Sequence, residues 1–533
     1  MYGFLAEHGA ELFAEELSDL FAAGVGRPSV PASVVGPALV LQALTGCSDR
    51  QAADSLTFDL RWKAACGVGV DERGFHYSVL CCYRRRIAAS DRPDRVFDLV
   101  ARLVAGCGAL TGRTRRVTDS TVVADAVARQ DTYQLLVWQV HRVRALFPEL
   151  ADWVDCLPGR AWYADRSRPQ IDWADPAARE DLVSVLVGDA LRIVQRAEHV
   201  LADRRSAWDR AETARAEAEG HDPCPWSDPV AVEAVGLLAL LAGQDVEPAE
   251  GSDGTDGRWR IARKVAEERV ISTVDTQARH ARKTRAHKVD GFKAHVLVEP
   301  DTGLVVQACL TSAAGPGSSD AAVGAQMVAD DPGCCPDGPV TAVLGDSAYD
   351  AATMHAACDT AKVACQAKAR PLHPAVPGGF TLDDFEVITS PDDPHSPGRV
   401  RCPGGHTVPR TAKGRADFTA RCGGCVVREQ CTTAAAGRVV TIGTDQLRSR
   451  AHRRQVAAPD VKADQRRHRP MVERTIARMV AAGRRVPYRG TTKNNAWWKL
   501  RAATTNLRQL VRMGLTRLAS GRWTLTQPAP VNP

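Results

Sequence analysis

Three acidic residues stand where their side chains could hold divalent cations. Asp119 lies inside a short β-branched segment, Asp346 follows an apolar segment, and Glu473 lies at the edge of an expected helix face formed by Val472 and Ile476. A single acid at a strand end is usually a turn or capping residue, so the argument rests on the combination. Oxygen ligands from two strands and a helix suit Mg²⁺, and two such ions can support phosphoryl transfer.

Cysteines form a second group of potential metal ligands. Cys402, Cys422, Cys425 and Cys431 have the spacing C-x19-C-x2-C-x5-C, which is typical of a closed structural Zn²⁺ site. His406 could replace one thiolate, and reduced thiols or another metal are alternatives to zinc. The other cysteines are scattered, which favours a reducing compartment over a disulfide framework.

Positive charge is concentrated in one segment of the chain. The 533 residues carry a net charge of +6, but residues 446–522 hold 20 Lys or Arg and only 3 acids, which leaves −11 elsewhere. This asymmetry points to a polyanion, most simply nucleic acid. Arg outnumbers Lys 58 to 11, which suits phosphate contacts, although an arginine-biased genome would produce the same excess. Trp497 and Trp498 in this segment could stack on bases, but their helical spacing favours core packing.

No run of about 18 apolar residues occurs, so we expect no membrane span. The first 21 residues have the pattern of an acidic amphipathic helix rather than of a secretion signal. We therefore expect a cytoplasmic protein that associates with the bacterial nucleoid.

The elements that must position these residues begin with helices. Residues 1–108 show helical periodicity, with a helix expected over 33–45 that ends at Gly46. Ser48 and Gln51 have the spacing of a capping box that opens the next helix. Two helices joined in this way resemble a helix-turn-helix, although an ordinary pair in a helical bundle fits equally well.

A mixed pattern follows from residue 115. We expect a strand that carries Asp119, a helical stretch over 128–243, a polar linker over 246–257 and a hairpin over 292–313. After the hairpin the pattern predicts a helix, a strand that ends near Asp346, a further helix and strand, and helices from about 461 to 518. This order of elements is that of an RNase H-like fold, which brings such acids together.

The chain resembles a cut-and-paste DDE transposase of bacterial insertion sequences. The segments that carry the resemblance are GRPSVPASVVGPALVLQALTGCSDRQAADSLTFDLRWKAACG, VTDSTVV, HKVDGFKAHVLVEPDTG, LGDSAYD, RPMVERTIARM and VPYRG. Many such transposases carry the third acid in a Tyr-x2-Arg-x3-Glu-x6-Lys signature. Arg469 and Glu473 match it here, whereas Arg466 and Val480 occupy the Tyr and Lys positions.

The resemblance implies an α/β fold whose RNase H-like mixed-sheet core carries an all-α N-terminal domain, a helical insertion and a small zinc-ribbon-like insertion. The expected boundaries are 1–108 for the helical DNA-binding domain, 109–130, 262–370 and 455–518 for the catalytic core, 131–261 for the helical insertion, and 371–454 for the cysteine-containing insertion.

The resemblance also implies a function. Asp119, Asp346 and Glu473 would bind two Mg²⁺ or Mn²⁺ ions and catalyse cleavage at the ends of the insertion sequence and joining to target DNA. The expected partners are double-stranded terminal inverted repeats, target DNA and a second copy of the chain. The alternatives are an inactive or domesticated DNA-binding protein and a stand-alone nuclease. The candidate DNA contacts are Arg50, Arg61 and Lys63 for reading the ends, and Lys293, Arg469, Arg484, Arg485 and Arg489 for the backbone.

Overall fold

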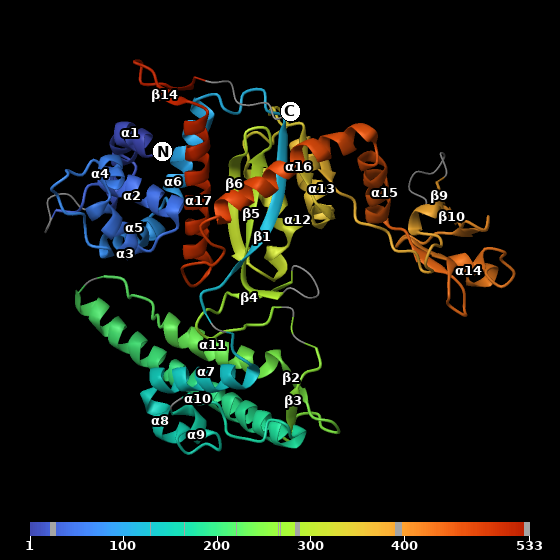
Figure 1. Ribbon diagram of the computed structural model, residues 1–533. Coiled ribbons are helices and arrows are strands. Elements are labelled where there is room, and N and C mark those ends of the chain that lie inside the picture. The colour runs from blue at the N-terminus through green and yellow to red at the C-terminus, as the bar shows by residue number, and fades with distance from the viewer. Residues whose placement is uncertain are drawn as a thin grey trace.

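The computed structural model describes residues 1–21, 28–127, 129–164, 166–219, 221–264, 266, 268–282, 288–389 and 397–526. A mixed β-sheet lies at its centre, with helices on both faces and two further groups of elements beside it (Figure 1). No helix in these ranges is both long and apolar enough to cross a membrane.

The central sheet combines antiparallel and parallel strands. β1 pairs with β5 antiparallel and with β7 parallel, and β8 continues the parallel side. On the other side of β5 lie both β6 and β4. The strands are β1 (Arg115–Ala124), β4 (Arg279–Arg282), β5 (Lys288–Glu299), β6 (Leu304–Ser312), β7 (Ala342–Gly345) and β8 (Ala364–Ala367). The predicted hairpin is thus confirmed as β5 and β6, and its turn contains Gly303 at φ +74°.

Helices cover the two faces of the sheet. α16 (Pro459–Val480) and α17 (Thr491–Arg512) share one apolar core with β1, β5 and β6. α12 (Asp320–Asp330) and α13 (Ala352–Ala361) form the core on the opposite face. Trp498 is fully buried in the first core and its Nε1 donates to the His295 carbonyl at 3.0 Å. This tryptophan therefore packs the helix on the sheet, as its spacing predicted.

The N-terminal helices belong to the same core as α17. They are α1 (Tyr2–Ala14), α2 (Ala32–Thr45), α3 (Asp49–Phe58), α4 (Leu60–Cys66), α5 (Ser78–Ala89) and α6 (Arg95–Gly106). The predicted capping box of Ser48 and Gln51 is present, and Gly46 ends α2 at φ +70°. An ion pair of 2.5 Å between Lys499 and Asp94 joins α17 to α6. These helices are consequently anchored on the last long helix of the chain (Figure 1).

The helical insertion has a hydrophobic core of its own. Its elements are α7 (Thr132–Leu146), α8 (Pro148–Val154), α9 (Arg160–Tyr163), the 44-residue α10 (Pro176–Glu219) and α11 (Pro229–Gln244), followed by β2 (Val246–Pro248) and β3 (Trp259–Ile261). The predicted linker is largely the loop between β2 and β3, and only its first three residues are strand. Ser184 on α10 exchanges two hydrogen bonds with the Trp259 backbone, at 2.9 and 3.2 Å.

A small unit of short strands lies beyond α15 (Thr444–Val456) at the right of Figure 1. Its strands are β9 (Glu386–Ile388), β10 (Arg399–Arg401), β11 (Thr407–Pro409), β12 (Arg415–Asp417) and β13 (Val439–Thr441). Phe385 and Phe418 are buried in its core. At the other end of the chain, the helical prediction up to 518 is wrong: Gly514 at φ +75° follows α17, and β14 (Leu515–Arg517) pairs with β15 (Trp523–Leu525).

Candidate catalytic site and nucleic-acid interface

Two of the candidate acids occupy equivalent positions beside each other, Asp119 within β1 and Asp346 directly after β7. β1 and β7 run parallel with Val117 opposite Leu344, and Asp119 and Asp346 each follow two residues later. The Asp119 Oδ1 accepts the Ser120 N–H, and the Asp346 Oδ1 accepts the Ala348 N–H, both at 2.8 Å. Because parallel strands keep their register, the two carboxylates lie next to each other where β7 ends.

The third acid, Glu473, comes from helix α16. α16 packs across β1, β5 and β7, and buries Val472 and Ile476 while the Glu473 side chain is 61% exposed. One turn earlier on the same helix, the Arg469 Nη2 lies 3.8 Å from the Glu473 Oε1. The helix therefore presents an acid and an arginine side by side along its solvent edge.

The charges of Asp346, Glu473 and Arg469 all act on the pKa of Asp119. Burial raises the pKa of Asp119 to about 6, and the nearby charges of Asp346 and Glu473 add to the rise, whereas Arg469 opposes it. An arrangement of mutually repelling carboxylates fits a divalent cation, whose charge would relieve the repulsion. In the described residues, the ligand oxygens of Asp119, Asp346 and Glu473 do not all lie within 4.8 Å of one another. At least two of these carboxylates are therefore farther apart than the ligands of one closely bound ion.

Three exposed arginines follow α16 and flank β1. Arg485 makes a parallel bridge to Ala124, and its Nε donates to the Asp125 carbonyl at 2.9 Å. The Arg484 Nη1 donates to Thr121 Oγ1 at 3.0 Å, and Thr121 is two residues after Asp119 on the same face of β1. Arg489 is also exposed. This segment thus brings positive charge to the strand that carries the first acid.

Lys293 lies on the other face of the sheet. On β5 it pairs with Val122, whose side chain alternates away from Asp119. Its Nζ is 2.6 Å from the Asp320 Oδ2 on α12. We therefore leave Lys293 out of the DNA-contacting set, because its ammonium is engaged beneath α12 rather than beside the acids.

The candidates on the N-terminal helices differ in exposure. Arg50 is exposed on α3 and stacks on the Tyr77 ring, with its Cζ 4.3 Å from the ring centroid. Arg61 is exposed on α4 and bonded to Asp59. Lys63, by contrast, is 5% exposed and its Nζ donates to the carbonyls of residues 69, 70 and 72. The structure therefore gives Lys63 a role in folding a loop, and its charge is not available to a phosphate.

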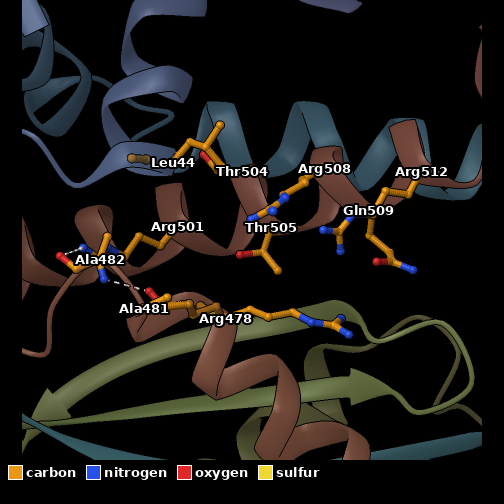
Figure 2. A pocket seen from close by; sticks show the side chains of 12 residues that line it. Leu44, Arg478, Ala481, Ala482, Arg501, Thr504, Thr505, Arg508, Gln509 and Arg512 are labelled. Atoms are coloured by element: carbon orange, nitrogen blue, oxygen red, sulfur yellow. Dashed lines mark hydrogen bonds between the residues drawn. The ribbon is translucent and has the colours of Figure 1, made fainter. Parts of the chain in front are cut away.

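An arginine-lined pocket, which the sequence did not single out, lies where α2, α16 and α17 meet (Figure 2). In the part of the chain that the structure describes, its lining contains four arginines and no carboxylate; the arginines are Arg478, Arg501, Arg508 and Arg512. Burial lowers the pKa of Arg478, and the charges of Arg512, Arg474 and Arg508 lower it further. The four-residue spacing of Arg474 and Arg478, and of Arg508 and Arg512, was the available sequence signal.

The four cysteines of the small unit line one common pocket together with His406. Burial raises the pKa of Cys431, and the other three cysteines add to the rise. Gly404 passes so close that a Cβ there would lie 2.7 Å from the Cys425 sulfur. The cysteines are not among the groups of three described ligand atoms that all lie within 4.8 Å of one another. The donor set suits zinc, but the sulfurs are not drawn into a tetrahedral cluster.

Comparison with known proteins adds two family matches. The transposase DDE domain family matches residues 401–511, which include α15, Glu473 and most of α17. A transposase domain family (DUF772) matches residues 7–86, which include α2 to α4 and much of α1 and α5. No curated protein and no solved structure matches the chain. Taken with the mixed sheet and the acid-bearing helix, the two matches support the resemblance of the chain to DDE transposases of insertion sequences.

Proposed function

We propose that the protein cuts DNA at the ends of its insertion sequence and joins those ends to target DNA, with Asp119, Asp346 and Glu473 as its catalytic acids. The observation that carries the proposal is the electrostatic coupling at Asp119, whose pKa responds to both other acids and to Arg469. A protein that only bound DNA would have no need for mutually repelling carboxylates beside a basic segment. The same observation does not distinguish a transposase from a stand-alone nuclease, and strand joining is the property that does.

The carboxylates would hold a pair of Mg²⁺ or Mn²⁺ ions. Bound there, the ions would activate the attacking oxygen and stabilise the oxygen that leaves the phosphorus. The chain's own contribution is positional: Asp119 and Asp346 are fixed by hydrogen bonds to backbone N–H groups, and Glu473 comes from a helix clamped on the sheet. Arg469 would orient Glu473 and contact the phosphate that is being cut.

DNA would be held by two surfaces. Arg484, Arg485 and Arg489 would contact the backbone next to the acids, and the arginine-lined pocket would accept a further phosphate. Arg50 and Arg61 on the N-terminal helices are the candidates for reading the terminal repeats. A Cβ added at Gly46, between α2 and α3, would lie 2.5 Å from the Cβ of Ala482. The N-terminal helices therefore contact the end of α16.

The remaining parts of the proposal concern architecture. We assign residues 1–108 to end recognition, 109–130, 262–370 and 455–518 to an RNase H-like core, 131–261 to a helical insertion and 371–454 to a zinc-ribbon-like insertion. In the last of these, Cys402, Cys422, Cys425 and Cys431 would hold one structural Zn²⁺. The chain would act as a homodimer, because one DNA element has two ends.

The test is a reaction of purified protein with DNA that carries the element's own terminal repeats, in Mg²⁺, with a target plasmid. We expect cleavage at the ends and joined products from the wild type, and neither from Asp119→Asn, Asp346→Asn or Glu473→Gln. Glu217→Gln, an exposed acid on α10, is the matched control and should retain activity. Cleavage without joining would favour the nuclease, and binding without cleavage would favour the inactive DNA-binding protein.

A further inference from the structure

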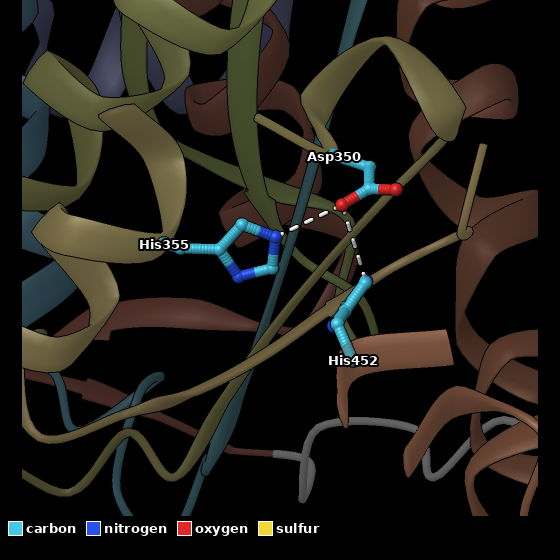
Figure 3. A group of neighbouring side chains, drawn as sticks. All are labelled: Asp350, His355 and His452. Carbon is cyan, nitrogen blue, oxygen red and sulfur yellow. Dashed lines mark hydrogen bonds and ion pairs between the residues drawn. The ribbon is translucent and has the colours of Figure 1, made fainter. Parts of the chain in front are cut away.

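A buried group of three side chains lies behind the candidate acids. The carboxylate of Asp350 meets the imidazoles of His355 and His452, and one ligand atom from each lies within 4.8 Å of the other two. The Asp350 Oδ1 is 2.9 Å from the His355 Nε2 and 3.8 Å from the His452 Nε2. All three residues are less than 9% exposed. Figure 3 shows both rings directed at the one carboxylate.

The three residues come from separate segments, two of which adjoin a candidate acid in the sequence. Asp350 follows the short helix η3 (Ser347–Tyr349), four residues after Asp346, and His355 is on α13. His452 is on α15, which leads directly into α16 and Glu473. The group is therefore the place where the segment after the second acid is fastened to the segment before the third.

The surroundings of the group resemble those of a metal centre whose outer contacts are already formed. The second oxygen of Asp350 accepts the Arg370 N–H at 2.8 Å, which leaves Oδ1 for the group. The Cys365 side chain lies next to the His355 ring. Ligating carboxylates and imidazoles are oriented by such outer partners in known metal sites. The His452 Nε2 donates to the Ala367 carbonyl at 2.9 Å, and a cation bound by this nitrogen would replace that hydrogen bond.

The donor set indicates the class of cation. Two imidazole nitrogens and one carboxylate oxygen are typical ligands for zinc and for neighbouring divalent transition metals, and are a poor set for Mg²⁺. The site shares no residue with the cysteine cluster or with the three acids.

We propose that Asp350, His355 and His452 bind a zinc ion that fastens α15 to the edge of the central sheet and thereby holds α16 and Glu473 in position. Its three ligands are buried and come from three elements, which favours a role in holding the fold together over one in binding substrate. It goes beyond the proposed catalytic function, and it holds whether or not the chain joins DNA strands.

The first test is the zinc content of the full-length protein after zinc loading and removal of loosely bound metal. We expect the double variant His355→Gln/His452→Gln to contain about one zinc per chain less than the wild type. His141→Gln is the matched control, because His141 is also hydrogen-bonded to a backbone carbonyl, that of Tyr163 at 2.7 Å, but lies outside the group. Equal zinc content in the wild type and the double variant would overturn the proposal.

The second test separates this site from the cysteine cluster by cobalt substitution. Co²⁺ bound at Asp350, His355 and His452 gives visible bands without a thiolate charge-transfer band, and these should persist in Cys422→Ser/Cys425→Ser. The bands should disappear when His452→Gln is added to that variant. If the cysteine variant does not fold, the difference spectrum between the wild type and His452→Gln replaces it, and a zero difference contradicts the proposal.

The third test measures the fastening itself. Hydrogen exchange of the α15 amides, residues 444–456, should slow at least several-fold when Zn²⁺ is added to metal-free wild-type protein. No such slowing is expected in His452→Gln. Exchange in α15 that does not respond to Zn²⁺ in the wild type would show that the group is only a hydrogen-bonded network.

Discussion

Arg469 and Glu473 stand one helical turn apart on α16, with the arginine Nη2 3.8 Å from the glutamate Oε1. The same arginine lowers the pKa of Asp119, so its guanidinium acts on a strand acid as well as on the helix acid. Arg469 therefore acts on two of the three proposed catalytic acids, and the first prediction concerns it.

Replacing Arg469 by Ala should reduce DNA cleavage by roughly 10- to 100-fold, because the reacting phosphate then lacks a positioned charge. Binding of the terminal repeats should change little. Cleavage and binding assays on the same DNA measure the two effects. Lys462→Ala, an exposed cation on the same helix, is the control. Equal cleavage by Arg469→Ala and the wild type would remove Arg469 from the site.

Replacing Asp119 by Asn should abolish cleavage and stabilise the metal-free protein. The pKa of Asp119 is about 6 in the folded chain, above its ordinary value, so its ionised form opposes folding. This cost is absent well below pH 4, grows as the pH rises through 6, and amounts to about 1–3 kcal/mol at neutral pH. Urea unfolding in chelator should show the variant more stable than the wild type at pH 7.5. The difference should shrink as the pH falls, and a constant difference would mean that titration is not its source.

The N-terminal helices allow a separation of recognition from stability. Arg50→Ala and Arg61→Ala should each weaken binding to the terminal repeats by about 1–3 kcal/mol and leave binding to unrelated DNA unchanged. Lys63→Met should instead lower the free energy of unfolding, by about 1–3 kcal/mol, because three carbonyls lose their donor. Competition binding and denaturant unfolding measure the two properties. A specific loss of end binding in Lys63→Met, at unchanged stability, would contradict this division.

The basic segment after α16 should set the salt dependence of DNA binding. Neutralising Arg484, Arg485 and Arg489 should weaken binding to all DNA alike, and reduce the slope of log K against log salt by about 3, one for each arginine that no longer meets a phosphate. Titrations at several salt concentrations measure the slope. Arg205→Gln, an exposed arginine on α10, should leave the slope unchanged.

Metal removal should loosen the small unit before the rest of the chain. If zinc holds Cys402, Cys422, Cys425 and Cys431, a strong chelator or Cys425→Ser should expose residues 399–442 to protease. The central sheet has its own core and should stay protected. Mass spectrometry of the fragments locates the cuts. A cleavage pattern that is the same with and without chelator would argue for reduced thiols.

Local sequence signals predicted the elements well, because their causes are local. The capping box at Ser48 and the hairpin of β5 and β6 follow from short-range hydrogen bonding and alternation, and both are present. The level placement of Asp119 and Asp346, by contrast, depends on the parallel pairing of β1 with β7, which no local signal predicts.

Contacts between distant segments were not predictable in this way. Lys63 lies in a basic helical pattern, but a loop folds back and surrounds its ammonium with carbonyls. Lys293 has the alternation of a strand, but its partner Asp320 comes from a helix 27 residues later. His452 meets Asp350 from a position 102 residues later in the chain, in a group that no short motif contains.

The place of α17 has a consequence for how the protein is made. This helix separates the N-terminal helices from the central sheet and is packed against both, yet it comes last in sequence among the long helices of the described residues. The N-terminal helices therefore keep an uncovered apolar face until α17 has been translated. Translation that stops before residue 491 would yield a chain without α17, so neither the N-terminal helices nor the sheet could bury the apolar surface that they share with it.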